Sequence, residues 1–206
     1  MPLVWTDTVY QTLYRAYRED GTGPISYGRE FAQSFWREQV SGLFGRKAGW
    51  IIGRGISTSA PVVVVGAGFG FLCEALKDAG ISNVVGIDFA PYIQSRLSTE
   101  KRLDISVISA TVGIDNVNSL LQQAGFPRTY DWVIDEDAAS SHSNAELPAF
   151  HSGCETLLKG NQKVRILHLV TPGPGGDTSL NWKTLAEWKA TAPTHTWMNI
   201  RTGEAV

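Results

Sequence analysis

Three acidic residues and a histidine follow one apolar run, where they could do acid–base chemistry. The run Tyr130–Asp135 ends in the first of these acids, Glu136 and Asp137 come directly after it, and His142 follows a few residues later. If the run is a strand of a parallel sheet, these side chains lie at its carboxyl edge, where such sheets bind ligands. Carboxylates favour a cationic reactant nearby, and histidine is suited to accept a proton near neutral pH. Asp135 and His142 are therefore the candidate catalytic residues.

A glycine-rich turn is the second informative feature. The β-branched run Val62–Val65 leads directly into Gly66, Ala67, Gly68 and, two positions on, Gly70, and then into a helical pattern. Glycine permits a tight turn and lets a ligand approach the backbone, while the following helix offers unpaired N–H groups. A strand, a turn and a helix in this order are the context that such a motif requires.

The next apolar run ends in an acidic residue, Asp88. It follows the glycine turn at close to the ~20-residue offset at which a carboxylate accepts hydrogen bonds from a ribose diol. Together the turn and the acid predict an adenosine-containing ligand without a 2′-phosphate. The dinucleotide fingerprint needs a small residue at position 71, where this chain has Phe71, which argues against NAD.

With these motifs the chain resembles the class I S-adenosylmethionine (SAM)-dependent methyltransferases. The resemblance spans about residues 60–172 and rests on Val62–Gly70, Gly86–Asp88, Tyr130–Asp135 and Leu157–Gly160 before Lys163–Val170. It implies SAM as the cofactor, with Gly66, Ala67, Gly68 and Gly70 near its methionine portion and ribose. It further implies that Asp88 binds the ribose hydroxyls, that Phe89 flanks the adenine and that Asp135 lies near the methyl group.

The first quarter of the chain is crowded with aromatic residues at helical spacing, which predicts two or three amphipathic helices before residue 58. We expect an N-terminal helical cap over residues 1–58 and a Rossmann-like core over residues 59–206. In the family that the chain resembles, such segments cover the cofactor and shape the acceptor pocket. Tyr27 and Phe31 are the expected walls of that pocket.

From Pro61 onwards, short β-branched runs alternate with helical patterns, which is typical of parallel βαβ units. The pattern predicts an α/β fold with an open, doubly wound, mostly parallel sheet in three α/β/α layers and a shortened C-terminal end. Helices are expected near residues 69–79, 91–101, 115–124, 144–158 and 179–190. The predicted strands are Val62–Val65, Asn83–Ile87, Ile105–Ser109, Tyr130–Asp135, Lys163–Val170 and His195–Ile200.

Composition narrows the function classes. Hydrophobic residues make up 43% and charged residues 18% of the 206 residues, as in globular proteins. The net charge of −2 provides no positive field for nucleic acid. The chain shows neither a membrane-spanning apolar stretch nor a secretory signal, so we expect a cytoplasmic protein. Cys73 and Cys154 are expected to be reduced, and the absence of a local Cys/His cluster predicts no metal site.

The leading hypothesis is a SAM-dependent methyltransferase that acts on a small molecule or a protein side chain. A non-catalytic structural or assembly protein with a methyltransferase fold is an alternative, because Val64 stands where the family often has an acid. Ser109-Ala110-Thr111 likewise replaces the acid that often follows the third strand, and Asp115 comes a few residues late. A NAD-dependent oxidoreductase is the third hypothesis. The sequence leaves the methyl acceptor and a homo-oligomeric state open.

Overall fold

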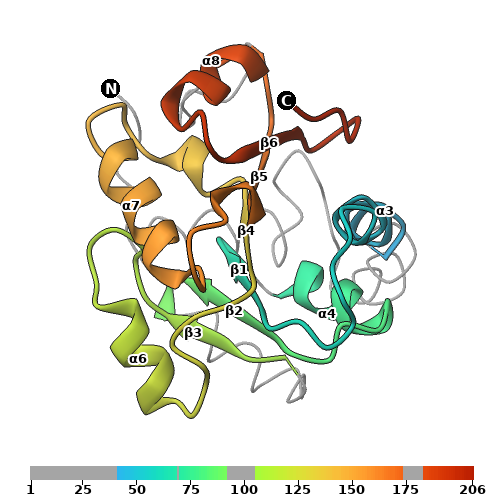
Figure 1. The fold of residues 1–206 in the computed structure, drawn as a ribbon, viewed down its shortest axis with the longest axis vertical. Helices are drawn as coiled ribbons and strands as arrows, with labels where there is room; N and C mark the ends of the chain where they lie inside the picture. The colour runs from blue at the N-terminus through green and yellow to red at the C-terminus, as the bar shows by residue number, and fades with distance from the viewer. Residues whose placement is uncertain (1–40, 69, 92–104, 174–182) are drawn as a thin grey trace, which may run out of the picture.

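The computed structural model describes residues 41–68, 70–91, 105–173 and 183–206. Within them, six parallel strands form one sheet in the order β3-β2-β1-β4-β5-β6 (Figure 1). The chain order reverses between β1 and β4, which creates the switch point at which such sheets bind ligands. The strands are β1 (Val62–Val65), β2 (Val84–Asp88), β3 (Val107–Ser109), β4 (Trp132–Glu136), β5 (Ile166–Val170) and β6 (Thr196–Asn199).

Helices cover both faces of the sheet, which confirms the three-layer α/β/α architecture (Figure 1). One face packs against α3 (Ser41–Ile52) and α4 (Phe71–Asp78), and the other against α6 (Val117–Gln123), α7 (Leu147–Leu157) and α8 (Leu185–Thr191). Because both faces are covered, every residue of β1 is buried, and its side chains alternate between the two apolar clusters.

All six predicted strands are present, with differences at their ends. The strand predicted from Lys163 begins at Ile166, because Lys163–Arg165 forms a 3₁₀ turn, η3. The strand predicted from Tyr130 begins at Trp132, since Tyr130 makes only an isolated bridge to Leu158. The predicted helices 69–79, 115–124 and 144–158 are each present in a shorter form.

Local interactions set where these helices begin. The α4 helix starts after Gly70, whose φ of 71° is left-handed and suits glycine. The N-terminus of α8 has a capping box, in which Thr184 and Glu187 each bind the other's backbone N–H. Residues 179–182 of the predicted helix 179–190 lie outside the described residues, as do positions 92–101 of the predicted helix 91–101.

The predicted N-terminal helices lie mostly outside the described residues, which begin at residue 41, and so do Tyr27 and Phe31. The described helix of that region, α3, packs on α4 and contributes Ala48 and Ile51 to the same apolar cluster as Val62 and Val64. The division into a cap over 1–58 and a core over 59–206 stays a prediction.

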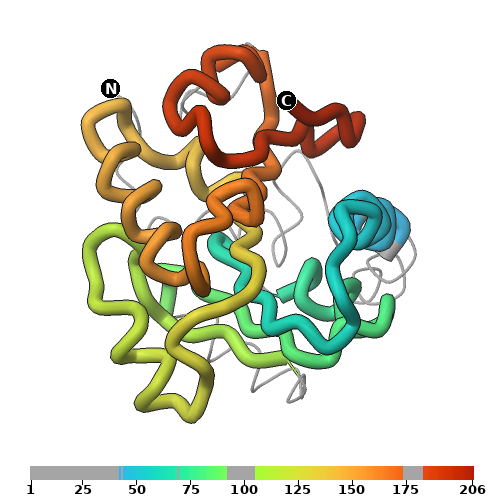
Figure 2. Tube along the Cα trace, in the orientation of Figure 1, coloured from blue at the N-terminus to red at the C-terminus, as the bar shows by residue number. Residues whose placement is uncertain are grey.

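The C-terminal end of the sheet is short, as predicted. β6 pairs in parallel with β5, and the chain then turns back so that Val206 and Trp197 exchange two backbone hydrogen bonds of 3.2 and 2.9 Å. Figure 2 traces this return beside β6. In the described part of the chain, no helix combines the length and the apolar character that crossing a membrane requires.

The contact between α7 and the loop after β3 depends on Gly153. A Cβ atom at Gly153 would lie 2.5 Å from the backbone nitrogen of Gly113, so Gly153→Ala must push the helix and the loop apart. We expect Gly153→Ala to lower the free energy of unfolding by about 1–3 kcal/mol. Gly49→Ala in α3 meets no atom within 4 Å and should raise it by about 0.5–1 kcal/mol. Urea unfolding of both variants measures the difference, and equal effects would contradict the packing argument.

Candidate functional site

The glycine turn fits between the ends of β2 and β4. Gly66 has a φ of 71°, and a Cβ atom there would lie 2.8 Å from Cβ of Ala138 and 3.0 Å from the carbonyl oxygen of Glu136. At Gly70 a Cβ atom would collide with Ile105. Ala67 donates its N–H to the carbonyl of Ile87 at 3.0 Å. Glycine is therefore required at both positions for the turn to pack closely against its neighbours.

Asp88 holds this turn from the end of β2. Its Oδ2 accepts a hydrogen bond from the N–H of Gly68 at 3.0 Å, and its Oδ1 accepts one from the N–H of Ala90 at 3.2 Å. Asp88 is buried. Burial raises its pKa to about 6 against the opposing effect of these N–H donors, and the nearby Glu136 raises it further. The acid and the glycine turn thus form one hydrogen-bonded unit.

Glu136, the last residue of β4, lies on the same face of the sheet as Asp88 and binds Lys47 of α3. The Lys47 Nζ atom lies 2.9 Å from Glu136 Oε1, and both side chains are almost fully buried. Lys47 also lies over the ring of Phe44, 4.3 Å from its centroid. Burial raises the pKa of Glu136, and Lys47 counteracts that rise. Two carboxylates and one cation therefore share this edge of the sheet.

Asp135 points to the opposite face and has no exposed surface. Its Oδ1 accepts hydrogen bonds from the N–H groups of Ala138 at 2.8 Å and Ala139 at 3.3 Å, and its Oδ2 lies 2.7 Å from Nδ1 of His168. Burial raises the pKa of Asp135 to about 7. Because Asp135 has no exposed surface, its carboxylate oxygens bind the loop after β4 and His168 instead of solvent.

The loop after β4 carries the other predicted catalytic residue. His142 follows the 3₁₀ turn η2 (Ala139–Ser141), and its Nδ1 lies 2.8 Å from the carbonyl oxygen of Ala138. The His142 ring is half-buried and packs against Phe150 with a centroid distance of 4.4 Å. Asp137, with a φ of 59°, accepts hydrogen bonds from the N–H and the hydroxyl of Thr171 after β5. Hydrogen bonds therefore fix the loop after β4 to the segment after β5, and ring packing fixes it to α7.

The structure brings most of the predicted SAM-site residues to one edge of the sheet: Gly66, Ala67, Gly68, Gly70, Asp88 and Phe89. Phe89 is half-buried and packs against the apolar cluster that α3 and α4 form with the sheet. Sequence reasoning missed Lys47 and Glu136 as partners, because 89 residues separate them in the chain.

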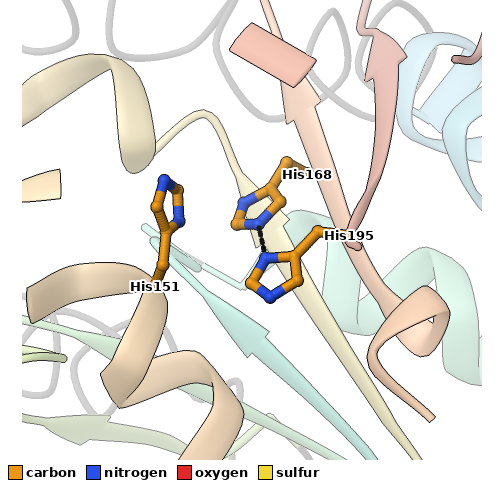
Figure 3. A group of neighbouring side chains, drawn as sticks. All are labelled: His151, His168 and His195. Carbon is orange, nitrogen blue, oxygen red and sulfur yellow. Dashed lines mark hydrogen bonds between the residues drawn. The ribbon is translucent and has the colours of Figure 1, made fainter. Parts of the chain in front are cut away.

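Sequence reasoning also missed a convergence of three histidines behind Asp135. His151 of α7, His168 of β5 and His195 just before β6 meet on the α7 side of the sheet (Figure 3). One available signal was His168 itself, a polar residue in the centre of an otherwise apolar buried strand.

Cys73 and Cys154 are buried and reduced, as predicted.

Comparison with known proteins identifies the fold. Over 93% of this chain and 85% of that one, the structure superposes on magnesium protoporphyrin IX methyltransferase (ChlM) from Synechocystis PCC 6803 with a TM-score of 0.60 at 16% identity. The YcgJ protein from Bacillus subtilis gives a TM-score of 0.50 at 16% identity over 77% of this chain and 68% of that one. The chain has a class I methyltransferase-like fold.

The remaining comparisons add no finer identification. The chain spans about half the length of the glycopeptide N-methyltransferase MtfA, with 56% of this chain and 49% of that one covered, a TM-score of 0.45 and 15% identity. No protein-family model and no curated protein sequence matches the chain.

The buried Lys47–Glu136 pair generates a stability prediction. Lys47→Met leaves Glu136 buried without its cation and should cost about 3–5 kcal/mol of unfolding free energy at pH 7. Adding Glu136→Gln should recover much of this loss, since no unpaired charge then remains. The half-exposed pair Lys163–Glu155 is the matched control, where Lys163→Met should cost at most about 1 kcal/mol.

The unfolding free energy of the Lys47→Met variant should depend on pH. Without Lys47 the pKa of Glu136 rises further, so the folded state binds its proton at higher pH than the unfolded state does. Stability lost at pH 7 should therefore return as the pH falls towards the ordinary pKa of glutamate. Urea titrations from pH 7 to 5 test this, and a loss that is independent of pH would show that Glu136 carries no charge in the folded protein.

Proposed function

We propose that the protein is a SAM-dependent methyltransferase that acts on a small molecule or a protein side chain. The observation that carries the proposal is the hydrogen bond from the Gly68 N–H to Asp88, which joins the glycine turn to the carboxylate at the end of β2. This unit lies at the switch point of a class I methyltransferase-like sheet. ChlM, which shares the fold, was crystallised with S-adenosylhomocysteine (SAH).

The residues of this edge fit the nucleoside part of SAM. An ionised carboxylate offers about four acceptor positions. Asp88 uses its two oxygens for the N–H groups of Gly68 and Ala90 and retains capacity for ribose hydroxyls. Gly66 and Gly70 let the turn pack closely against the neighbouring strand ends. Phe89 offers an apolar surface next to Asp88.

The charge of this edge fits a sulfonium. When bound, SAM supplies a methyl group on a positively charged sulfur. With Asp88 and Glu136 ionised and Lys47 protonated, the edge has one negative charge in excess. This excess favours the cationic cofactor over its neutral product, and it explains what two buried carboxylates gain by lying close together.

The loop after β4 supplies the proposed acceptor side. Asp135 fixes the N–H groups of Ala138 and Ala139, and the carbonyl of Ala138 in turn accepts a hydrogen bond from Nδ1 of His142, which favours the Nδ1–H tautomer. This tautomer leaves the lone pair of His142 on Nε2, where it can accept the proton of an attacking nucleophile. We therefore keep His142 as the proposed base and assign Asp135 as the residue that positions its loop.

Ligand binding tests the proposal directly. SAH should bind with micromolar affinity and raise the melting temperature, because a ligand of the native state stabilises it, whereas NAD should not. Asp88→Ala should weaken SAH binding by about 1–3 kcal/mol, or roughly 5- to 150-fold, since ribose hydroxyls lose their acceptor. Asp131→Ala, just before β4 and at the opposite edge of the sheet, is the control and should bind normally. Calorimetry with NAD binding and no SAH binding would favour the oxidoreductase instead.

The raised pKa of Asp88 predicts a pH dependence of that affinity. The ribose hydroxyls require the ionised carboxylate, and the pKa of Asp88 in the free protein is about 6. Affinity for SAH should be constant from pH 8 to 7 and should fall about tenfold per unit once the pH is below 6. Asp88→Asn should show weak binding with a flat profile. A wild-type profile that is flat down to pH 5 would remove Asp88 from the binding site.

A further inference from the structure

The buried histidines behind Asp135 form a donor set that the proposed methyl transfer does not use. His151, His168 and His195 come from three different elements, and none is more than 6% exposed. Each offers one ring nitrogen to a common space, and these nitrogens lie within 4.8 Å of one another. Figure 3 shows the three rings grouped around this space, with His168 and His195 in direct contact.

Two carboxylates fix the outer nitrogens of His168 and His195. Nδ1 of His168 lies 2.7 Å from Asp135 Oδ2, and Nε2 of His195 lies 3.2 Å from Glu155 Oε1. Glu155 Oε2 also accepts a hydrogen bond from Nζ of Lys163 at 2.6 Å, so this carboxylate is an acceptor.

The inner nitrogens of His168 and His195 face each other. Nε2 of His168 lies 2.9 Å from Nδ1 of His195. When ionised Asp135 and Glu155 accept the N–H groups of the outer nitrogens, both inner nitrogens carry lone pairs and can bind one cation. The alternative is one additional proton, held by Asp135 or by one of the rings, which lets one ring donate a hydrogen bond to the other.

His151 adds a third lone pair. The hydroxyl of Thr191 donates to the carbonyl of Trp188 at 2.7 Å, so towards His151 it can only accept. Nε2 of His151, 3.1 Å from this hydroxyl, is therefore the protonated nitrogen, and Nδ1 carries the lone pair. Among the described residues, His151 Nδ1 is one of the few buried side-chain atoms without a hydrogen-bond partner.

We propose that His151, His168 and His195 bind a divalent transition-metal ion of the zinc type, through Nδ1, Nε2 and Nδ1 respectively. Neutral imidazole is a preferred ligand of Zn²⁺, and three imidazoles with one further position are a known arrangement for it. Asp135, Glu155 and the Thr191 hydroxyl act as the outer partners that hold each ligand nitrogen in its required tautomer.

The geometry needs only side-chain adjustments. Zn–N bonds of about 2.0–2.1 Å place tetrahedral nitrogens roughly 3.4 Å apart. The 2.9 Å pair must therefore open slightly, and the farthest nitrogen must move inwards. His195 also lines a surface pocket of about 380 Å³ together with Lys163, Lys189 and Pro193, so one side of the cluster lies next to the protein surface.

The site would stabilise the short C-terminal end of the sheet. An ion at this position joins α7, β5 and the segment that leads into β6, which are far apart in sequence. β6 is an edge strand, and among the described residues its outer side pairs with the short return of residues 203–206. A metal bond here therefore restrains an edge of the sheet.

Metal titration of the chelator-treated full-length protein tests this site. One Zn²⁺ per chain should bind by calorimetry and raise the melting temperature, and Co²⁺ should give the visible absorption of tetrahedral coordination. His151→Gln should lower the affinity more than ~100-fold, which exceeds the effect of removing an outer partner. Because the Nδ1 atom of His151 has no partner in the protein, this variant breaks few contacts and should fold.

Two further variants separate a built site from adventitious binding. Glu155→Gln changes a partly exposed residue and should lower Zn²⁺ affinity by about 10–100-fold without removing a ligand. His142→Gln removes the histidine outside the cluster and should leave the affinity unchanged. The proposal is overturned if wild-type protein binds no stoichiometric Zn²⁺, which would mean that a proton alone lies between His168 and His195. It is equally overturned if His142→Gln lowers the affinity as much as His151→Gln does.

Discussion

Side chains alternate between the two faces of a strand, and at the end of β4 this alternation separates two adjacent carboxylates. Glu136 points towards α3 and the glycine turn, where Lys47 binds it. Asp135 points towards α7, in register with His168 on β5, which is itself in register with Trp197 on β6. The proposed cofactor site and the proposed metal site therefore lie on opposite faces of one strand end. A shift of one residue in the register of β4 would exchange the two carboxylates and destroy both sites.

Both sites contain carboxylates that burial disfavours in their charged form. Asp88 and Asp135 have raised pKa values because they lie in the protein interior, and Glu136 depends on Lys47 for its charge. Such groups reduce stability unless they are paired, and they persist where a function requires them. The apolar layers around β1 provide the stability that offsets this cost, since every residue of β1 is buried.

The sequence predicted what local patterns encode. The β-branched runs located the six strands, and the glycine turn was correctly placed next to Asp88, at the edge where we propose that a nucleoside binds. Strand ends were less predictable, because turns such as Lys163–Arg165 use residues that also suit strands. The pairing of Lys47 with Glu136 and the meeting of the three histidines depend on tertiary packing, which no spacing in the sequence reveals. The side of β4 that Asp135 faces was equally hidden, since it depends on register.

The two faces are connected through one small residue, Ala138. Its N–H donates to Asp135, its Cβ occupies the space that a side chain at Gly66 would need, and its carbonyl accepts from His142. Asp135 in turn contacts His168, so a continuous set of hydrogen bonds and one tight contact runs from the histidine cluster to the glycine turn. Anything that fixes His168 also fixes Asp135, because that carboxylate is fully buried and cannot turn to water instead. An ion held by the histidines would therefore order the loop after β4 on which the proposed base His142 stands.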